Sequence, residues 1–160
     1  VTGTRFDVIN YLKEDKTEIA LESGKVVLYQ CSDDQEKSIT DLKPGELAVF
    51  DKTRKSIHIR QVQTDKYTAW VNGRIIFRDD PMDEVVRRLN RWYNVDIKVA
   101  DPEIHSYIYT ATFLNESLDQ ILELLTISAP IRFEVTRRER EGDVFSPKQI
   151  ILKQKRTIHN

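Results

Sequence analysis

The sequence predicts an α+β protein, with an N-terminal all-β sandwich or roll followed by a small α/β domain of two tandem strand-helix-strand repeats. Three observations predict this fold class. Residues 1–62 contain short runs in which apolar and polar side chains alternate, which is the period of a β-strand. Two stretches with the period of an α-helix follow. The second of these stretches reproduces the spacing of the first.

The strands expected in residues 1–62 are bounded by sequences that favour turns. We expect turns at residues 13–16, 23–24, 43–46 and 51–55, and a polar loop at residues 32–37. No helical period occurs in this part of the sequence, so an antiparallel arrangement is expected. The alternating apolar residues between the turns are Phe6 and Val8, Ile19 and Leu21, Val26 and Leu28, Leu47 and Val49, and Ile57 and Ile59.

A helix is predicted after this β region. The preceding segment WVNGRIIF, residues 70–77, is expected to be a strand with Asn72-Gly73 as a bend or hairpin turn. The apolar residues that follow recur on one face of a helix. They are Met82, Val85, Val86, Leu89, Trp92 and Tyr93.

Both ends of this helix are marked in the sequence. Asp80 is expected as the N-cap and Pro81 as the first helical residue, where a missing N–H has no cost. Asp83 places a negative charge near the positive end of the helix dipole. Asn94 is expected to end the helix, and the alternation at residues 95–99 predicts a strand after it.

The second helical stretch aligns with the first when the sequence is shifted by 36 residues. Phe77 then falls on Phe113, and Met82 falls on Leu118, without a gap. Ser117, with a glutamine three residues later at position 120, predicts a capping box for the second helix. A last strand at residues 149–153 is expected to pair with a strand at residues 131–137. We therefore predict two domains, residues 1–66 and residues 67–160.

The charge balance and the lack of long apolar segments restrict the class of protein. There are 25 basic and 26 acidic side chains, so the net charge of −1 gives no general attraction to nucleic acid or to an anionic membrane surface. No stretch approaches the roughly 20 apolar residues that span a bilayer, and no signal peptide opens the chain. The protein is therefore either cytosolic or a fragment cut downstream of its targeting segment. The opening VTGTRFDVI favours the fragment.

The residue types that carry catalysis or bind metals are scattered. His58, His105 and His159 have no partner at metal-ligand spacing, and the single cysteine, Cys31, excludes a cysteine-rich metal site. No nucleophile elbow, P-loop or dinucleotide-binding glycine motif is present. We therefore expect no enzyme, no cofactor and no metal site.

Three groups of residues could be functional but have a simpler structural interpretation. The carboxylate pairs Asp33-Asp34 and Asp79-Asp80 are interpreted as a solvated loop and a helix cap rather than a calcium site, because the ligand spacing of an EF-hand is absent. Trp92 and Tyr93 lie on the apolar face of the first helix, so we expect core packing rather than a stacking surface. Cys31 is expected to be a half-buried side chain rather than a thiolate.

The outward faces of the two predicted helices carry opposite charges. The first presents Arg87, Arg88 and Arg91 with Glu84, and the second presents Glu116, Asp119 and Glu123 with Gln120. Two interpretations stay open. The faces could simply be solvated, with Glu84 and Arg88 as an i,i+4 pair. Alternatively, the charged residues could form a protein-docking surface, on which charge complementarity selects the partner and its orientation.

Several segments resemble the periplasmic part of FecR-type anti-sigma regulators, especially those of Bacteroidetes. These segments are VTGTRFDV, ESGKV, LKPGE and AWVNGRIIFRDDPMDEVVRRLNRWYNVDI. The most specific signal comprises Trp70, Asn72, Gly73, Phe77, Arg91, Trp92, Tyr93, Asn94 and Val95. The resemblance implies a FecR domain up to about Val62. It also implies a C-terminal domain from Tyr67 to Lys153, similar to the short N-terminal domain of secretins and TonB-dependent transducers.

The resemblance also implies a signalling role. Full-length members have a cytoplasmic segment that binds an extracytoplasmic-function sigma factor, then one transmembrane helix, then this periplasmic region. The signalling domain of a TonB-dependent outer-membrane receptor contacts the C-terminal domain of the regulator, by edge-strand pairing or through the charged helices. The regulator then releases or activates its sigma factor. Regulated proteolysis is a usual step. An alternative is a periplasmic sensor that binds a glycan or small ligand through Trp70, Trp92 or Tyr93.

Overall fold

The computed structural model of the chain describes residues 3–12, 14–32, 35–136, 140–141, 144–145 and 147–155, with side chains outside 30–37 and 140–145. The chain divides into two compact units, Val1–Gly73 and Arg74–Asn160. The sequence predicts this boundary between residues 66 and 67. Each unit has its own hydrophobic core.

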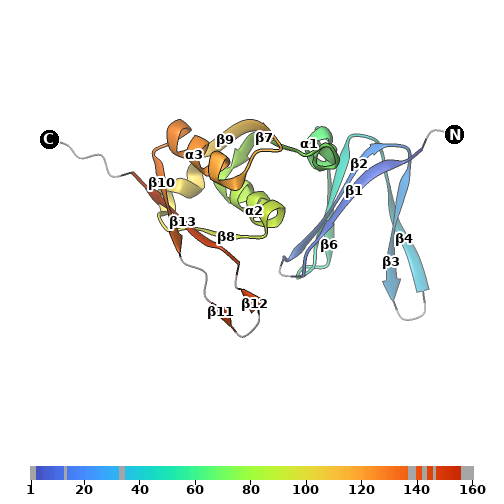
Figure 1. Cartoon of the computed structure of the whole chain (residues 1–160). Coiled ribbons are helices and arrows are strands. Elements are labelled where there is room, and N and C mark those ends of the chain that lie inside the picture. The colour runs from blue at the N-terminus through green and yellow to red at the C-terminus, as the bar shows by residue number, and fades with distance from the viewer. Residues whose placement is uncertain are drawn as a thin grey trace. The chain divides into compact units, whose positions relative to one another are not determined.

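The first unit consists mainly of antiparallel strands (Figure 1). Strands β1, β2, β5 and β6 form a four-stranded sheet in that order, and β3 pairs with β4 in a separate hairpin. A small core of Leu21, Leu42 and Ala48 joins the sheet to the hairpin. The bounds are β1 Arg5–Asn10, β2 Lys16–Ser23, β3 Val26–Ser32, β4 Gln35–Leu42, β5 Glu46–Asp51 and β6 Ser56–Gln61.

The predicted polar loop at residues 32–37 is wrong in its extent. Strand β3 continues to Ser32, and β4 begins at Gln35. Residues 35–38 carry no apolar side chain that could reveal a strand period. Their backbone pairs with β3 across the hairpin, because each residue offers an N–H and a C=O whatever its side chain is.

The predicted strand at residues 70–77 is also wrong in its first half. A short helix α1, Asp65–Thr68, runs into a 3₁₀ helix η1, Ala69–Asn72, and strand β7 begins only at Arg74. Gly73 adopts the left-handed conformation (φ 66°), and its N–H donates to the Trp70 carbonyl at 3.0 Å. Asn72-Gly73 is therefore the C-terminal cap of a helix rather than a bend within a strand.

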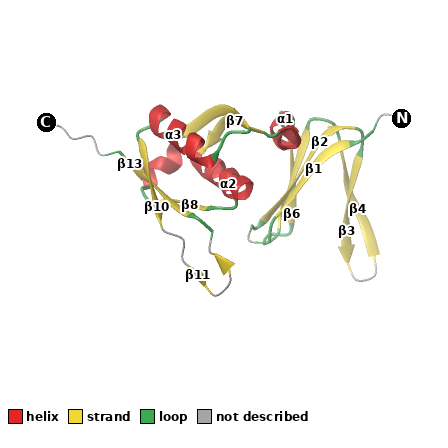
Figure 2. Cartoon of the chain, viewed as in Figure 1, coloured by secondary structure: helices red, strands yellow, loops and turns green. Residues whose placement is uncertain are grey.

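The second unit places two helices against two small sheets (Figure 2). Strand β7 pairs with β9 in an antiparallel ribbon, while β13 lies between β10, antiparallel to it, and β8, parallel to it. The predicted pairing of the last strand with residues 131–137 is confirmed. The bounds are β7 Arg74–Pro81, α2 Met82–Tyr93, β8 Asp96–Val99, η2 Pro102–Ser106, β9 Ile108–Leu114, α3 Leu118–Ser128, β10 Ile131–Thr136, β11 Arg140–Glu141, β12 Val144–Phe145 and β13 Gln149–Gln154.

Helix α2 buries the predicted apolar face, with one exception at its C-terminal end. Met82, Val85 and Leu89 are fully buried, but Trp92 is 37% exposed, so its predicted core packing is wrong. Asn94 ends the helix as expected, in the left-handed conformation (φ 50°). The N-cap is Pro81, which has no side-chain hydrogen bond, and not Asp80. Asp80 belongs to β7, where its carboxylate has a different role.

The order strand, helix, strand occurs twice in this unit, as β7-α2-β8 and β9-α3-β10. Helix α3 has the predicted capping box: the Gln120 N–H donates to Ser117 Oγ, and the Ser117 N–H donates to Gln120 Oε1 at 2.8 Å. Two of the non-glycine residues with positive φ stand at equivalent places ahead of the helices. They are Asp79 (φ 49°) and Asn115 (φ 53°).

The capping box gives a test of the fold. We expect Ser117→Ala to lower the free energy of unfolding by about 1 kcal/mol, because one N–H of the first turn loses its acceptor. Urea unfolding followed by far-UV circular dichroism measures this change. The matched control is Ser128→Ala, whose hydroxyl donates to the Leu124 carbonyl at the other end of the helix and satisfies no N–H. Equal destabilisation by both changes would contradict a specific role of the cap.

Candidate protein-docking surface

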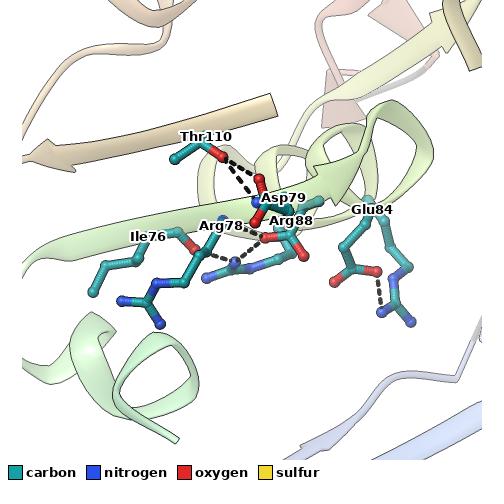
Figure 3. A network of polar contacts seen from close by, with 8 residues as sticks. Ile76, Arg78, Asp79, Glu84, Arg88 and Thr110 are labelled. Atoms are coloured by element: carbon teal, nitrogen blue, oxygen red, sulfur yellow. Dashed lines mark hydrogen bonds and ion pairs between the residues drawn. The ribbon is translucent and has the colours of Figure 1, made fainter. Parts of the chain in front are cut away.

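Arg88 lies across the end of strand β7 and does not extend into solvent (Figure 3). Its side chain is only 16% exposed. The guanidinium donates to the Ile76 carbonyl, and Nη1 lies 3.8 Å from Asp80 Oδ2. Its Cζ atom also lies 4.9 Å from the centre of the Phe77 ring, in a cation–π arrangement. Arg88 therefore joins α2 to β7 and is held by the fold.

Asp79 and Asp80 form the bulge in β7 that receives Arg88. The register of β7 against β9 shifts between Phe77 and Asp80. Asp79 takes positive φ, with its N–H donating to Thr110 Oγ1 at 2.9 Å, and Asp80 turns inward to accept from the Arg78 N–H at 3.0 Å. A buried carboxylate needs such partners. The predicted helix cap at this pair is wrong for that reason.

The other basic residues of α2 are partly covered. Glu84 pairs with Arg87, three residues later, and the two side chains are about three-quarters buried. The sequence predicts Glu84 to pair with Arg88 instead, but the Arg88 guanidinium is directed to β7. Arg91 is partly buried and engaged in contacts of its own. The predicted basic face is thus less open than the sequence suggests.

The acidic residues before and on α3 differ in exposure. Asp119 and Glu123 are exposed, and Asp119 pairs with Lys148 at 3.0 Å. Glu116 lies before the N-cap, and its carbonyl accepts a hydrogen bond from Tyr93 Oη at 2.6 Å. Burial, with a smaller contribution from the Glu116 charge, raises the pKa of the Tyr93 hydroxyl. The Tyr93 hydroxyl therefore links the end of α2 to the start of α3, and the predicted packing of Tyr93 against the core is confirmed.

The outward face of α3 also carries two apolar side chains that the sequence analysis missed. Leu124 is 43% exposed and Ile127 is 80% exposed. They stand three residues apart on one side of the helix, next to Gln120 and Glu123 at i,i+4 spacing. The signal was available in the sequence, because positions 124 and 127 lie off the stripe that aligns with the buried face of α2. We call Leu124, Ile127, Asp119 and Glu123 the α3 patch.

The aromatic residues of the recognised motif are divided among several roles. Trp70 is half exposed, and its Nε1 donates to Asp7 Oδ1 at 2.9 Å, which accounts for the burial of an aspartate in β1. Phe77 is buried between Tyr109 and Phe113, with both rings edge-on to it at 6.2 and 6.3 Å. Gly73 and Asn94 are both helix C-caps in the left-handed conformation.

Several candidates for chemistry have no site in the structure. Among the described residues, no three His, Cys, Asp or Glu side chains are grouped as metal ligands. His105 contacts the Asp83 carboxylate at the first turn of α2, and His58 points to solvent as predicted. Asp33, Asp34 and His159 lie outside the described residues, as does the side chain of Cys31. In the part of the chain that the structure covers, no helix has the length and apolar character to cross a membrane.

Comparison with known proteins identifies the second unit. Residues 74–141 match the family model described as FecR, C-terminal. A crystal structure at 1.65 Å of an anti-sigma factor candidate from Parabacteroides distasonis ATCC 8503 has a TM-score of 0.64 and 25% sequence identity, over 96% of this chain and 66% of that one. A second crystal structure described in the same way, at 2.50 Å, has a TM-score of 0.61 and 24% identity, over 92% of this chain and 62% of the other. No curated protein matches the chain at a significant level.

These findings place the chain in a class of regulatory proteins. The match of residues 74–141 and the two similar crystal structures support a FecR-type anti-sigma factor, which confirms the resemblance seen in the sequence. The chain spans about two thirds of the length of the solved structures that it resembles.

The buried contacts of Arg88 lead to a prediction about stability. We expect Arg88→Ala to lower the free energy of unfolding by about 2 kcal/mol, because the Ile76 carbonyl loses a hydrogen-bond donor and the buried Asp80 carboxylate loses its ion-pair partner. Denaturant unfolding measures the change. Arg132→Ala is the control, since its guanidinium is half exposed and pairs with Glu134 at the surface, and we expect a change within roughly 0.5 kcal/mol. A similar small effect at Arg88 would show that its contacts do not support the fold.

Proposed function

We propose that this chain is the signal-receiving, periplasmic region of a membrane-anchored anti-sigma regulator. The proposal is supported by the match of residues 74–141 to the C-terminal domain of the FecR family. In this role the chain contacts a TonB-dependent outer-membrane receptor. The complete regulator passes the occupancy of that receptor to an extracytoplasmic-function sigma factor, through a transmembrane helix and a cytoplasmic segment outside these 160 residues.

Such a relay needs contact rather than catalysis. The receptor can shift the regulator between two states only by as much as it binds one state better than the other. A surface that mixes apolar and charged groups suits this purpose, because the apolar centre supplies affinity and the charges select the partner.

The α3 patch is the observation that carries the docking proposal. Ile127 and Leu124 supply an exposed apolar centre, and Asp119 and Glu123 place carboxylates beside it. Scattered single apolar residues are normal on a protein surface, but two neighbours on one helix face with a charged margin resemble an interface. We therefore propose that α3 docks the signalling domain of the receptor through an apolar area with a basic margin on that domain.

The basic residues of α2 are a second candidate surface. The sequence groups Arg87, Arg88 and Arg91 there, but Arg88 is held by β7 and should be left out of a docking test. Replacing Arg88 with an acidic residue would break its contacts with β7, so a loss of binding would reflect unfolding of this region rather than a lost contact with the receptor. Only Arg87 and Arg91 remain as proposed contacts.

We also propose that β7-α2-β8 and β9-α3-β10 are copies of one unit. The proposal is supported by the N-caps at Pro81 and Ser117 and by the positive-φ residues Asp79 and Asn115, since both pairs keep the 36-residue spacing seen in the sequence. The buried residues Phe77 and Phe113 keep it as well. Docking on α3 would then use the second copy, whose helix has the exposed apolar residues Leu124 and Ile127 on its outward face.

The docking proposal predicts the effect of a charge on the α3 patch. We expect Ile127→Lys to weaken binding to the receptor's signalling domain roughly tenfold or more, because it removes the apolar centre and repels a basic margin. Glu123→Lys should weaken binding less and mainly slow association, with a reduced dependence on salt. Biolayer interferometry at several salt concentrations measures both effects.

Matched controls separate the two surfaces. Val71→Lys makes the same type of change at an exposed apolar position of the first unit and should leave the affinity unchanged. Arg87→Glu with Arg91→Glu tests the α2 surface. If this pair abolishes binding while Ile127→Lys has no effect, docking belongs to α2 and not to α3. Failure of the wild-type chain to bind any signalling domain encoded beside it would count against the proposed function itself.

A sensor that binds a glycan or small ligand is the alternative, and the exposure of two indole rings favours it. Trp70 is half exposed in the first unit, and Trp92 is partly exposed in the second. Tyr93 is less suited, because its ring packs against the core. A fluorescence titration with glycans should show saturable quenching that Trp92→Phe or Trp70→Phe removes. Without such quenching, the alternative fails.

A further inference from the structure

Strand β9 has an open edge that differs from the other strand edges of the second unit. Among the described strands, only β7 is hydrogen-bonded to β9. The seven residues of β9, IYTATFL, contain no charged residue, no proline and no glycine. An uncharged, regular edge strand presents a row of backbone N–H and C=O groups and is a ready template for pairing with another strand.

The other edges of this unit carry the usual protection against such pairing. Strand β8 has only four residues and carries Asp96 and Lys98. Strand β10 carries Arg132 and Glu134, and hydrogen bonds from Lys153 and Arg132 lower the pKa of the Glu134 carboxyl, so the edge stays charged. Strand β7 ends in a charged bulge. Strand β9 has none of these protective features, which indicates that its open edge pairs with another strand.

The sequence of β9 is nearly symmetric about its central residue. On either side of Ala111 stand two threonines, then an aromatic residue, then an aliphatic residue: Thr110 and Thr112, Tyr109 and Phe113, Ile108 and Leu114. If two copies of this strand pair antiparallel about Ala111, each residue lies opposite one of its own chemical type. Threonine pairs and aromatic pairs are among the favourable cross-strand neighbours.

We propose that this chain forms a two-fold symmetric dimer in which the β9 strands of two copies pair antiparallel about Ala111. The occupant of the open edge is therefore a second copy of the chain. The two β7-β9 ribbons would join into one four-stranded sheet. Ile108 and Leu114, which are 61% and 57% exposed, would cover each other at both ends of the shared edge.

The geometry of an antiparallel ladder agrees with this axis. Alternate residues of β9 direct their backbone groups to the open edge. With a two-fold axis at Ala111, residue 110 of one copy lies opposite residue 112 of the other, and both direct their backbone groups to the same side of the strand. The free N–H and C=O groups of the two copies can therefore pair, whichever set of alternate residues faces the open edge. The other edge of the ribbon is β7, with its bulge, so the assembly closes at two copies and does not extend into a fibre.

The dimer is separate from the receptor-docking proposal. It uses the edge of β9, whereas docking is assigned to α3, and neither proposal requires the other. Its test therefore uses the chain alone, without a receptor domain.

The test is a charge rescue in the full chain. Leu114→Glu and Ile108→Lys each place one charge opposite an apolar residue of the second copy and should each weaken the dimer roughly tenfold or more. Both positions are exposed, and residue 114 lies opposite Arg74 in β7, so the glutamate suits the monomer. An equimolar mixture of the two variants should restore a mixed dimer, because position 114 of one copy then faces position 108 of the other with opposite charge.

Sedimentation equilibrium over a concentration series gives the dimer affinity, and native mass spectrometry identifies the mixed dimer. Val135→Glu, at an exposed aliphatic position of β10, is the matched control and should leave dimerisation unchanged. A wild-type chain that stays monomeric at every concentration would overturn the proposal, as would variants that dimerise like the wild type or a mixture without rescue. A monomeric wild type whose binding to a receptor domain is abolished by Leu114→Glu would instead assign the edge to a receptor strand.

Discussion

The packing around Phe77 is the interaction on which the second unit depends. A ribbon of two strands is only marginally stable in water, and β7 with β9 is such a ribbon. The Phe77 ring contacts Tyr109 and Phe113 of the neighbouring strand edge-on, and the Arg88 guanidinium covers it from α2. Aromatic side chains bury much apolar area and favour this edge-to-face geometry. Through one ring, the ribbon and the helix become parts of the same core.

This packing limits what α2 can offer to a partner. Once Asp80 is buried in the bulge, its charge needs an opposite charge nearby, and Arg88 supplies one from the neighbouring helix. Arg88, which the sequence places on a solvated face, therefore contacts β7 and supports the fold. Helix α3 has no basic residue that must pair with a buried carboxylate of the sheet. Its outward side chains are therefore not needed for such a contact and can serve an interface. The difference between the two helices follows from one buried carboxylate.

The sequence was sufficient for features that depend on local pattern. The strand alternation, the buried stripe of α2, the capping box at Ser117 and the strand at residues 149–153 all follow from periodicity or capping chemistry. It was insufficient where a tertiary contact overrode the pattern. Asp80 looked like an N-cap because nothing local shows that Arg88 will reach it. Asn72-Gly73 looked like a hairpin turn because a hairpin and a helix C-cap both use left-handed glycine.

The candidate site was predicted only in part for the same reason. Charged positions on both helices could be identified from the sequence, but their exposure depends on which side chains fold back onto the sheet. Trp92 lies at the edge of the apolar stripe of α2 and is 37% exposed, so its position on the stripe was not enough to predict its burial. Ile127 lies in an apolar stretch of α3 but beside its buried stripe, so the sequence analysis did not single it out.

The position of β13 has a consequence for how this domain is made. Its residues lie between β10 and β8, so the central strand of that sheet is synthesised after both of its neighbours. Before β13 has been synthesised, β8 and β10 have no hydrogen-bonding neighbour in this sheet and stay unpaired. Contacts of such sequence separation form slowly and leave unpaired edges open to misassociation. In a nascent chain of this protein, the edges of β8 and β10 therefore stay unpaired until β13 has been added.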